Sequence, residues 1–220
     1  FTAGVRVGTT QFENHMFIGN GYVTPYKYNG SAFTRHGVPQ ASSSGMTGAV
    51  SGGGSITTDT YYYKVAFVNA QAAIGDVSTA TTAFAISSAS GTVNLTAIPV
   101  APTSHGVGSR RIYRANTTTA ASFGLLATLA DNTTTTYSDT GAVTPTVAAP
   151  TDNGEPPKYN VICYHQGRLF CNDLTNPGYV WYSEINEPYT FASTNFRKRH
   201  DFELNAHHTH ASGRLRTYDS

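Results

Sequence analysis

The feature that most constrains the fold is the repeated alternation of short apolar runs with turn-forming residues. Residues 165–191, HQGRLFCNDLTNPGYVWYSEINEPYTF, show this pattern in its densest form, with an aromatic residue every few positions. Aromatic and β-branched residues favour strands, whereas Asn, Pro and Gly favour the turns between them. Few segments of the chain have the period of a helix. The chain is therefore predicted to be all-β.

The composition narrows the classes of function. The 220 residues are enough for one large or two small domains with a sizeable core. Only 12% of the residues are charged and the formal net charge is +1, so no global charge points to a nucleic acid or an acidic partner. No apolar run approaches the roughly 20 residues that a membrane helix needs, and we expect no membrane anchor.

Two segments that are poor in packing residues divide the chain into three parts. Residues 41–55, ASSSGMTGAVSGGGS, are predicted to be a flexible linker, and residues 144–157, with four prolines, a second one. Between them, residues 56–143 contain about six or seven short strand patterns, which is typical of a small β-sandwich. We place the domains at residues 1–50, 56–143 and 158–220, with the sandwich inserted into another β structure.

The outer two parts are rich in aromatic residues and are expected to pack together. Asn29 and Gly30 form a strong hairpin signal. The strand pair around this turn carries three aromatic residues that can cover one face: Tyr26, Tyr28 and Phe33. The aromatic faces of residues 10–38 and 158–200 have no other large partner in the sequence. We expect these segments to pack against each other in one sheet system although more than 100 residues separate them.

The two cysteines are predicted to be unpaired. Gln166 and Gly167 form the two-residue turn of a hairpin, and this turn sets the register of its strands. Side chains alternate between the two faces of a strand, so Cys163 and Cys171 point to opposite sides of the sheet. Two free thiols, which we expect to be buried, suit a protein assembled in the cytosol.

One pair of carboxylates could serve in glycoside hydrolysis, which needs two such groups at a defined separation. Glu184 and Glu187 flank Asn186 in SEINEP, and Asp173 lies before them. Glu187 precedes Pro188 in a turn, where a carboxylate commonly caps the turn or faces water. No serine-hydrolase, zinc-protease or phosphate-loop motif is present. We expect turn formation here and no enzymatic activity.

Two clusters offer metal ligands. Imidazoles at positions i and i+2 of a strand can hold a transition metal, and the chain has a histidine cluster near its end: His200, His207, His208 and His210. The alternative is a solvated or packed strand edge. Oxygen ligands that suit calcium come from Asp131, Asn132 and Asp139, but their spacing matches no EF-hand, and turn formation is the alternative. We expect no metal and no cofactor.

Two basic strips alternate with aromatic residues, and such a pattern can bind a nucleic acid backbone. One strip is SRRIYR, with Arg110, Arg111 and Arg114, and the other is FRKRH, with Arg197, Lys198 and Arg199. Edge strands also carry basic residues simply because these residues prevent unwanted pairing. The net charge near zero favours this second interpretation.

In their order along the chain, several segments resemble structural proteins of tailed bacteriophages. They are TYYYKVAFVN, VNLTAIPV, RRIYRAN, LLATLADNTTTTYSDT, PPKYNVICYHQGRLFCND and NPGYVWYSEINEPYTF. In that family a fibronectin type III-like sandwich interrupts a β-propeller. The likeness is to tail proteins of the tubular or nozzle kind, and it covers residues 10–200. A propeller needs typically four or more blades, and the outer segments can supply about two, so we expect a piece of a longer protein.

The resemblance implies a structural component of a virion, a tube, nozzle or hub subunit that acts by assembly. Its partners would be copies of itself in a ring or tube, other tail proteins and DNA passing through a lumen, and it would be assembled in the host cytoplasm. The strand SRRIYRAN is expected to be exposed and to offer Arg110, Arg111, Tyr113 and Arg114 to a neighbour, because Arg and Tyr are enriched at interface centres. The alternative is a carbohydrate-binding host-recognition protein, followed by a polysaccharide-degrading enzyme.

Overall fold

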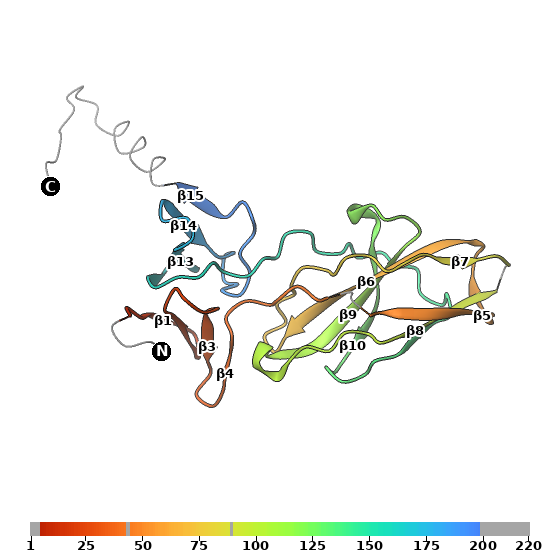
Figure 1. Ribbon diagram of the computed structural model, residues 1–220, viewed down its shortest axis with the longest axis horizontal. Helices are drawn as coiled ribbons and strands as arrows, with labels where there is room; N and C mark the ends of the chain where they lie inside the picture. Colours follow the sequence, from red (N-terminus) through yellow and green to blue (C-terminus); the bar gives the residue numbers. More distant parts are fainter. Residues whose placement is uncertain (1–4, 43–44, 89, 199–220) are drawn as a thin grey trace, which may run out of the picture.

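The protein is all-β in a computed structural model that describes residues 5–42, 45–88 and 90–198. Its strands form four separate antiparallel sheets. The helical pieces among the described residues are two short 3-10 turns, Thr103–His105 and Ala120–Ser122. Figure 1 shows two small sheets at one end of the molecule and a larger pair of sheets at the other.

The two small sheets have the same topology. The first, here called the N-sheet, has the order β1-β2-β3-β4 and consists of β1 (Gly8–Phe12), β2 (His15–Gly19), β3 (Tyr26–Tyr28) and β4 (Phe33–Arg35). The second, the C-sheet, has the order β12-β13-β14-β15 and consists of β12 (Ile162–His165), β13 (Arg168–Asn172), β14 (Tyr179–Tyr182) and β15 (Phe196–Lys198). Each sheet is a meander in which consecutive strands are neighbours.

The residues between these sheets form a β-sandwich. One of its sheets has the order β10-β9-β6-β7 and consists of β6 (Asp59–Asn69), β7 (Phe84–Ile86), β9 (Val107–Ala115) and β10 (Gly124–Leu129). The other has the order β11-β8-β5 and consists of β5 (Thr47–Ile56), β8 (Gly91–Thr96) and β11 (Tyr137–Asp139). The alternation of Tyr61, Tyr63, Val65 and Phe67 places one face of β6 in the core between the two sheets.

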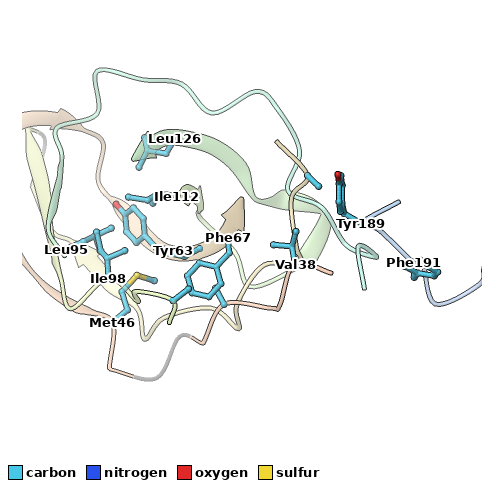
Figure 2. Close-up of a cluster of buried hydrophobic side chains, with 14 of the residues drawn as sticks. Val38, Met46, Tyr63, Phe67, Leu95, Ile98, Ile112, Leu126, Tyr189 and Phe191 are labelled. Carbon is cyan, nitrogen blue, oxygen red and sulfur yellow. The ribbon is translucent and has the colours of Figure 1, made fainter. Parts of the chain in front are cut away.

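Figure 2 shows that core as a continuous cluster. Tyr63 and Ile112 from one sheet meet Leu95 from the other, and Met46 closes the cluster beside Ile98. The cluster extends through Val38, Tyr189 and Phe191 toward the N-sheet and the C-sheet (Figure 2). One hydrophobic core therefore runs through the sandwich and on into the region of the small sheets.

The prediction that residues 41–55 are a flexible linker is wrong. Residues 47–56 form β5, which pairs with β8 from Thr47 opposite Thr96 to Gly52 opposite Gly91. Gly48 has a packing role, because a Cβ at this position would lie 2.6 Å from the carbonyl oxygen of Asn94. The glycines that suggested a linker thus lie in a strand beside β8.

The Pro-rich segment, residues 144–157, is not a free linker either. Its residues run along β10, where Leu125 N–H donates to the Val147 carbonyl and Ala149 N–H donates to the Phe123 carbonyl. Further along, Asn153 N–H donates to Asp76 Oδ1 at 2.7 Å. These bonds join the segment to the sandwich, so the prediction that residues 144–157 are a flexible linker is wrong.

The N-sheet and the C-sheet pack against each other, as predicted from their aromatic residues. Phe12 of β1 and Tyr164 of β12 have ring centroids 4.9 Å apart. At the end of β2, Gly19 leaves room for the Tyr159 ring, whose nearest atom would lie 2.4 Å from an added Cβ. The two segments remain separate sheets whose first strands, β1 and β12, are adjacent.

The register of the β12–β13 hairpin agrees with the turn prediction. His165 pairs with Arg168, Cys163 with Phe170, and Ile162 with Cys171. Both cysteines are free, as predicted, but only Cys171 is buried, whereas Cys163 is exposed. The expectation of two buried thiols is therefore wrong for Cys163, which lies on the face of the C-sheet that points away from the core.

Candidate functional site

The four residues of the expected interface lie on β9, and the structure places them largely inside the sandwich. β9 pairs with β6 on one side and with β10 on the other, so it is a central strand. The exposed fraction is 0% for Arg110 and 1% for Tyr113. Arg111 and Arg114 keep partial exposure. The prediction that this strand is exposed is wrong, and so is the interpretation that its arginines protect a sheet edge.

Arg110 stabilises the loops at one end of the sandwich. Its guanidinium donates to the carbonyl oxygens of Pro99, Asp131 and Thr134 at 2.9, 3.1 and 2.6 Å. It also lies 3.3 Å from Asp131 Oδ1. A buried guanidinium with this many acceptors is satisfied by charge-assisted hydrogen bonds. Arg110 therefore has a structural role.

Arg114 belongs to a second buried polar group. Its Nη1 lies 2.7 Å from Asp139 Oδ2, and the Tyr63 hydroxyl donates to the same oxygen at 2.8 Å. Burial and, after it, the negative charge of Asp139 raise the pKa of Tyr63 far above its ordinary value. The group joins β6, β9 and β11, and thus both sheets of the sandwich.

The proposed calcium ligands are occupied by other contacts. Asp131 accepts hydrogen bonds from the backbone of Thr134 and Thr133, which lower the pKa of its carboxyl. Asn132 bonds the backbone of Ala101 at both its amide atoms. In residues 5–42, 45–88 and 90–198, no group of three or more metal-ligating side chains is brought together. The histidine cluster, His200, His207, His208 and His210, lies outside the described residues.

The carboxylates considered for glycoside hydrolysis lie at turns of the C-sheet. Glu184 and Glu187 face each other in an isolated β-bridge. Glu184 Oε1 accepts a hydrogen bond from the Asn195 amide, and Glu187 Oε1 accepts one from the Thr190 hydroxyl. The buried Asp173 accepts bonds from two backbone N–H groups and from the Trp181 indole. Each of the three carboxylates is engaged in holding a local turn.

We expect Glu184→Gln and Glu187→Gln to leave folding and assembly unchanged. Glutamine keeps the oxygen that accepts each bond, so the free energy of unfolding should change by no more than about 0.5 kcal/mol. Neither the wild type nor the variants should release reducing sugars from polysaccharides. Sugar release by the wild type that either substitution abolishes would contradict the structural role.

A buried polar cluster lies between the N-sheet and the C-sheet, and no motif in the sequence indicates His36 as its centre. His36 is fully buried beside the rings of Phe17 and Phe191. Burial lowers the pKa of His36 to about 3, so its imidazole is neutral. Its Nε2 donates to the Pro188 carbonyl at 2.7 Å, and its Nδ1, 3.0 Å away, accepts the proton of the Tyr159 hydroxyl. His36 thereby joins segments from both ends of the chain.

Lys27 lies in the same region and is buried without a hydrogen-bond partner for its ammonium among the described residues. Its side chain is 3% exposed. The ammonium lies 4.3 Å from the centre of the Tyr189 ring. Burial lowers the pKa of Lys27 to about 8. A sequence signal existed, because Lys27 alternates with Tyr26 and Tyr28 and must therefore face the opposite side of β3.

The outer face of the N-sheet is aromatic, and no other described residue fully covers it. Met16, Tyr28 and Phe33 are direct neighbours across β2, β3 and β4. The rings of Tyr28 and Phe33 stack with centroids 4.6 Å apart, and 58% of Phe33 is exposed. Tyr26 lies two residues from Tyr28 and shares this face, as predicted. We call Met16, Tyr26, Tyr28 and Phe33 the N-face.

The corresponding face of the C-sheet combines aromatic and basic side chains. Phe170 and Tyr182 are cross-strand neighbours with ring centroids 6.1 Å apart. The guanidinium groups of Arg168 and Arg197 lie 5.2 and 5.7 Å from the centre of the Tyr182 ring. Together these residues form what we call the C-face. Arg197 comes from the second basic strip, of which Lys198 also lies on β15, whereas Arg199 lies outside the described residues.

Comparisons with protein-family models, with curated proteins and with solved structures find no match to this chain. In the part of the chain that the structure describes, no helix is long and apolar enough to cross a membrane. The N-face and the C-face are therefore candidate contact surfaces on the basis of their geometry alone.

Proposed function

We propose that the protein is a structural subunit of a bacteriophage tail, of the tube, nozzle or hub kind, that acts by assembly. The observation that carries the proposal is the pairing of the N-sheet and the C-sheet. Both are four-stranded meanders, they come from opposite ends of the described chain, and their first strands are adjacent (Figure 1). Propellers are built from four-stranded blades arranged around a central channel. The N-sheet and the C-sheet each have the strand number of such a blade, and this supports the proposal.

The uncovered faces support assembly as the mode of action. In a propeller each blade packs on two neighbouring blades, whereas among the described residues each small sheet packs on one other small sheet. On the N-face Phe33 is exposed, and on the C-face Phe170 and Tyr182 are half-buried, where a further sheet would cover them. Contiguous exposed apolar patches of this kind are typical of protein interaction sites. We propose neighbouring copies of this chain and other tail proteins as the partners, with DNA passing through the lumen of the tube.

In the same proposal, the inserted sandwich is a fibronectin type III-like module of the tail subunit. Its two sheets share one core, and that core continues toward the small sheets through Val38. The Arg35 guanidinium of β4 also donates to Glu155 Oε2 at 2.8 Å and lies 3.3 Å from His105 of the sandwich. A module held this firmly would move with the small sheets as one body in an assembly. The proposed location is the virion, after assembly in the host cytoplasm.

The proposal predicts that Phe33→Asp prevents self-assembly. A charge at Phe33, the most exposed side chain of the N-face, would have to be desolvated in the contact, and removal of an aromatic hot-spot residue commonly costs about 2 kcal/mol or more of binding. The particle mass from light scattering and negative-stain images should show rings or tubes for the wild type only. The control is Val147→Asp, because Val147 is 56% exposed, close to the 58% of Phe33, but lies on the sandwich.

The virion location has its own test. Mass spectrometry of purified particles of the phage that encodes this sequence should detect the protein at a constant number of copies per particle. Its absence from such particles would refute the proposal, as would rings that persist in the Phe33→Asp variant.

The exposed stack of Tyr28 and Phe33 favours one alternative, a carbohydrate-binding host-recognition protein. Exposed aromatic rings that lie together can form a platform for a sugar ring, because one face of each ring is free for stacking. A glycan array probed with the wild type and with Phe33→Asp separates the two functions. Binding that depends on Phe33, together with a monomeric wild type, would favour recognition over assembly.

A further inference from the structure

The longest edge strand among the described residues, β5, lacks the features that protect the other described sheet edges. β5 is ten residues long, and the order β11-β8-β5 gives it a neighbour on one side only. Among the described residues, no backbone hydrogen bond other than those of the β8 ladder reaches residues 47–53. An edge strand presents unpaired N–H and C=O groups and is a template for another strand. Residues 47–52 of β5 therefore offer a regular, free ladder.

The other sheet edges in the described chain are short, charged or covered. β4, β7, β11 and β15 each have three residues, and three of these strands carry a charged residue: Arg35 on β4, Asp139 on β11, and Arg197 and Lys198 on β15. β12 has four residues, and β1 lies beside it. β10 is covered by residues 147–149. Such features prevent edge-to-edge pairing in native proteins.

β5 has none of these features. Its sequence, TGAVSGGGSI, contains no charged residue and no proline. Val50, in the middle of the regular stretch, is 44% exposed. The composition of this strand is that of a flexible linker, so its glycines need a structural explanation.

Gly52 gives the second, independent observation. Its backbone is not in the left-handed region, and a Cβ added there would meet no atom within 4 Å. Neither backbone conformation nor packing within the chain requires glycine at this position. This contrasts with Gly48, where β8 leaves no room for a side chain. Glycine inside a strand commonly marks a bulge or a close approach of another backbone. The register shift of β5 begins after Gly52, whereas Gly52 itself still pairs with Gly91 in the regular ladder.

We propose that β5 pairs, antiparallel, with β5 of a second copy of this chain. The two-fold contact joins the β11-β8-β5 sheets of two sandwiches into one continuous sheet. Self-pairing brings only small, uncharged side chains opposite one another, so no like charges meet. β5 lies at the end of the molecule away from the N-sheet and the C-sheet, so the contact leaves both faces of those sheets free (Figure 1).

The contact does not depend on the proposed tail function, and its test can be kept separate from ring formation. About six residues a side make a small interface, well below the roughly 800 Å² per partner of stable complexes, so the dimer is weak and depends on concentration. We would measure sedimentation from micromolar to millimolar concentration in the Phe33→Asp background, in which contacts through the N-face are already blocked. The expected result is a monomer that becomes a dimer as concentration rises.

Charge substitutions at Val50 test the pairing directly. Val50→Lys and Val50→Glu should each abolish the dimer over the same range, because antiparallel pairing brings the two copies of the charge close together. An equimolar mixture of the two variants should restore it. Ala85→Lys, which adds the same charge to the exposed middle of the β7 edge, is the control and should still dimerise. Thermal unfolding of each variant confirms that the fold is intact.

Three outcomes would overturn the inference. They are a protein that stays monomeric at every concentration, a Val50→Lys variant that dimerises like its parent, and a mixture of the two charge variants that stays monomeric. If the wild type forms no rings, the tail proposal is refuted, but the pairing of β5 with a second β5 is not.

Discussion

Replacing Asp139 with alanine should lower the free energy of unfolding by about 3–5 kcal/mol, because breaking a buried ion pair leaves its partner uncompensated. The Asp139 side chain is 1% exposed and accepts bonds from both Arg114 and Tyr63. Without it, the Arg114 guanidinium keeps only the Val143 carbonyl as a hydrogen-bond acceptor among the described contacts. The Tyr63 hydroxyl, fully inside the sandwich, loses its acceptor as well.

Urea denaturation followed by tryptophan fluorescence would measure the loss. Asp59→Ala is the matched control, because Asp59 is exposed and should shift the midpoint little. Adding Arg114→Met to Asp139→Ala should recover part of the loss, since the charge that was left unpaired is then also removed. A midpoint for Asp139→Ala close to that of the control would show that the buried group does not hold the two sheets together.

Replacing Lys27 with methionine should have the opposite effect and stabilise the protein by about 2 kcal/mol at pH 7. Burial lowers the pKa of Lys27 from 10.5 to about 8, so the folded protein pays for a desolvated charge at neutral pH. A pKa lowered by this much corresponds to roughly 3 kcal/mol, of which the contact with the Tyr189 ring offsets about 1 kcal/mol. Methionine fills a similar volume without a charge.

The pH dependence of this gain identifies its cause. Between pH 8 and pH 10.5 the unfolded chain holds the Lys27 proton and the folded protein does not, so wild-type stability should rise through this window. Below pH 8 both states are protonated and the full penalty is present. The advantage of Lys27→Met should therefore be constant below pH 8 and disappear toward pH 10.5.

The measurement compares the two proteins at each pH. Buried tyrosines such as Tyr159, whose pKa is raised by burial, destabilise both proteins in alkali, and the difference between the proteins cancels this effect. Lys158→Met is the control, since Lys158 is exposed and should show no gain. A gain from Lys27→Met that is independent of pH would point to better packing and not to relief of a buried charge.

The turns, the hairpin register and the faces of the strands could be predicted from the sequence, because they depend on neighbouring residues. The turn at Gln166 and Gly167 has φ angles of 44° and 79°, both in the left-handed region that a tight hairpin of this type needs. A two-residue turn sets the register of the strands beside it, so the pairing of Cys163 with Phe170 follows from the turn alone. The assignment of the aromatic residues of β6 to one face is equally local, because side chains alternate along any strand.

The sequence did not predict the features that depend on contacts with distant parts of the chain. Residues 47–56 lack the large side chains that indicate a strand, and they form β5 because β8, about 40 residues away, supplies a ladder. The burial of Lys27 has the same cause, because alternation along β3 sets the face on which Lys27 lies but not which residues cover that face. Lys27 is covered by Tyr189, which lies at the other end of the described chain.

The arginines of β9 show this division most clearly. Alternation along the sequence correctly separates Arg110 and Arg114 from Arg111, because the period of a strand is a property of the backbone itself. Whether a strand lies at an edge or in the middle of a sheet depends on which other strands pair with it. β6 and β10 enclose β9, and loops and strands from elsewhere supply the carbonyls around Arg110 and the carboxylate of Asp139 beside Arg114. The amino acids thus determined the strands, turns and faces, whereas the tertiary structure decided which charges are buried and which edge, that of β5, stays open, because long-range pairing has no local signal.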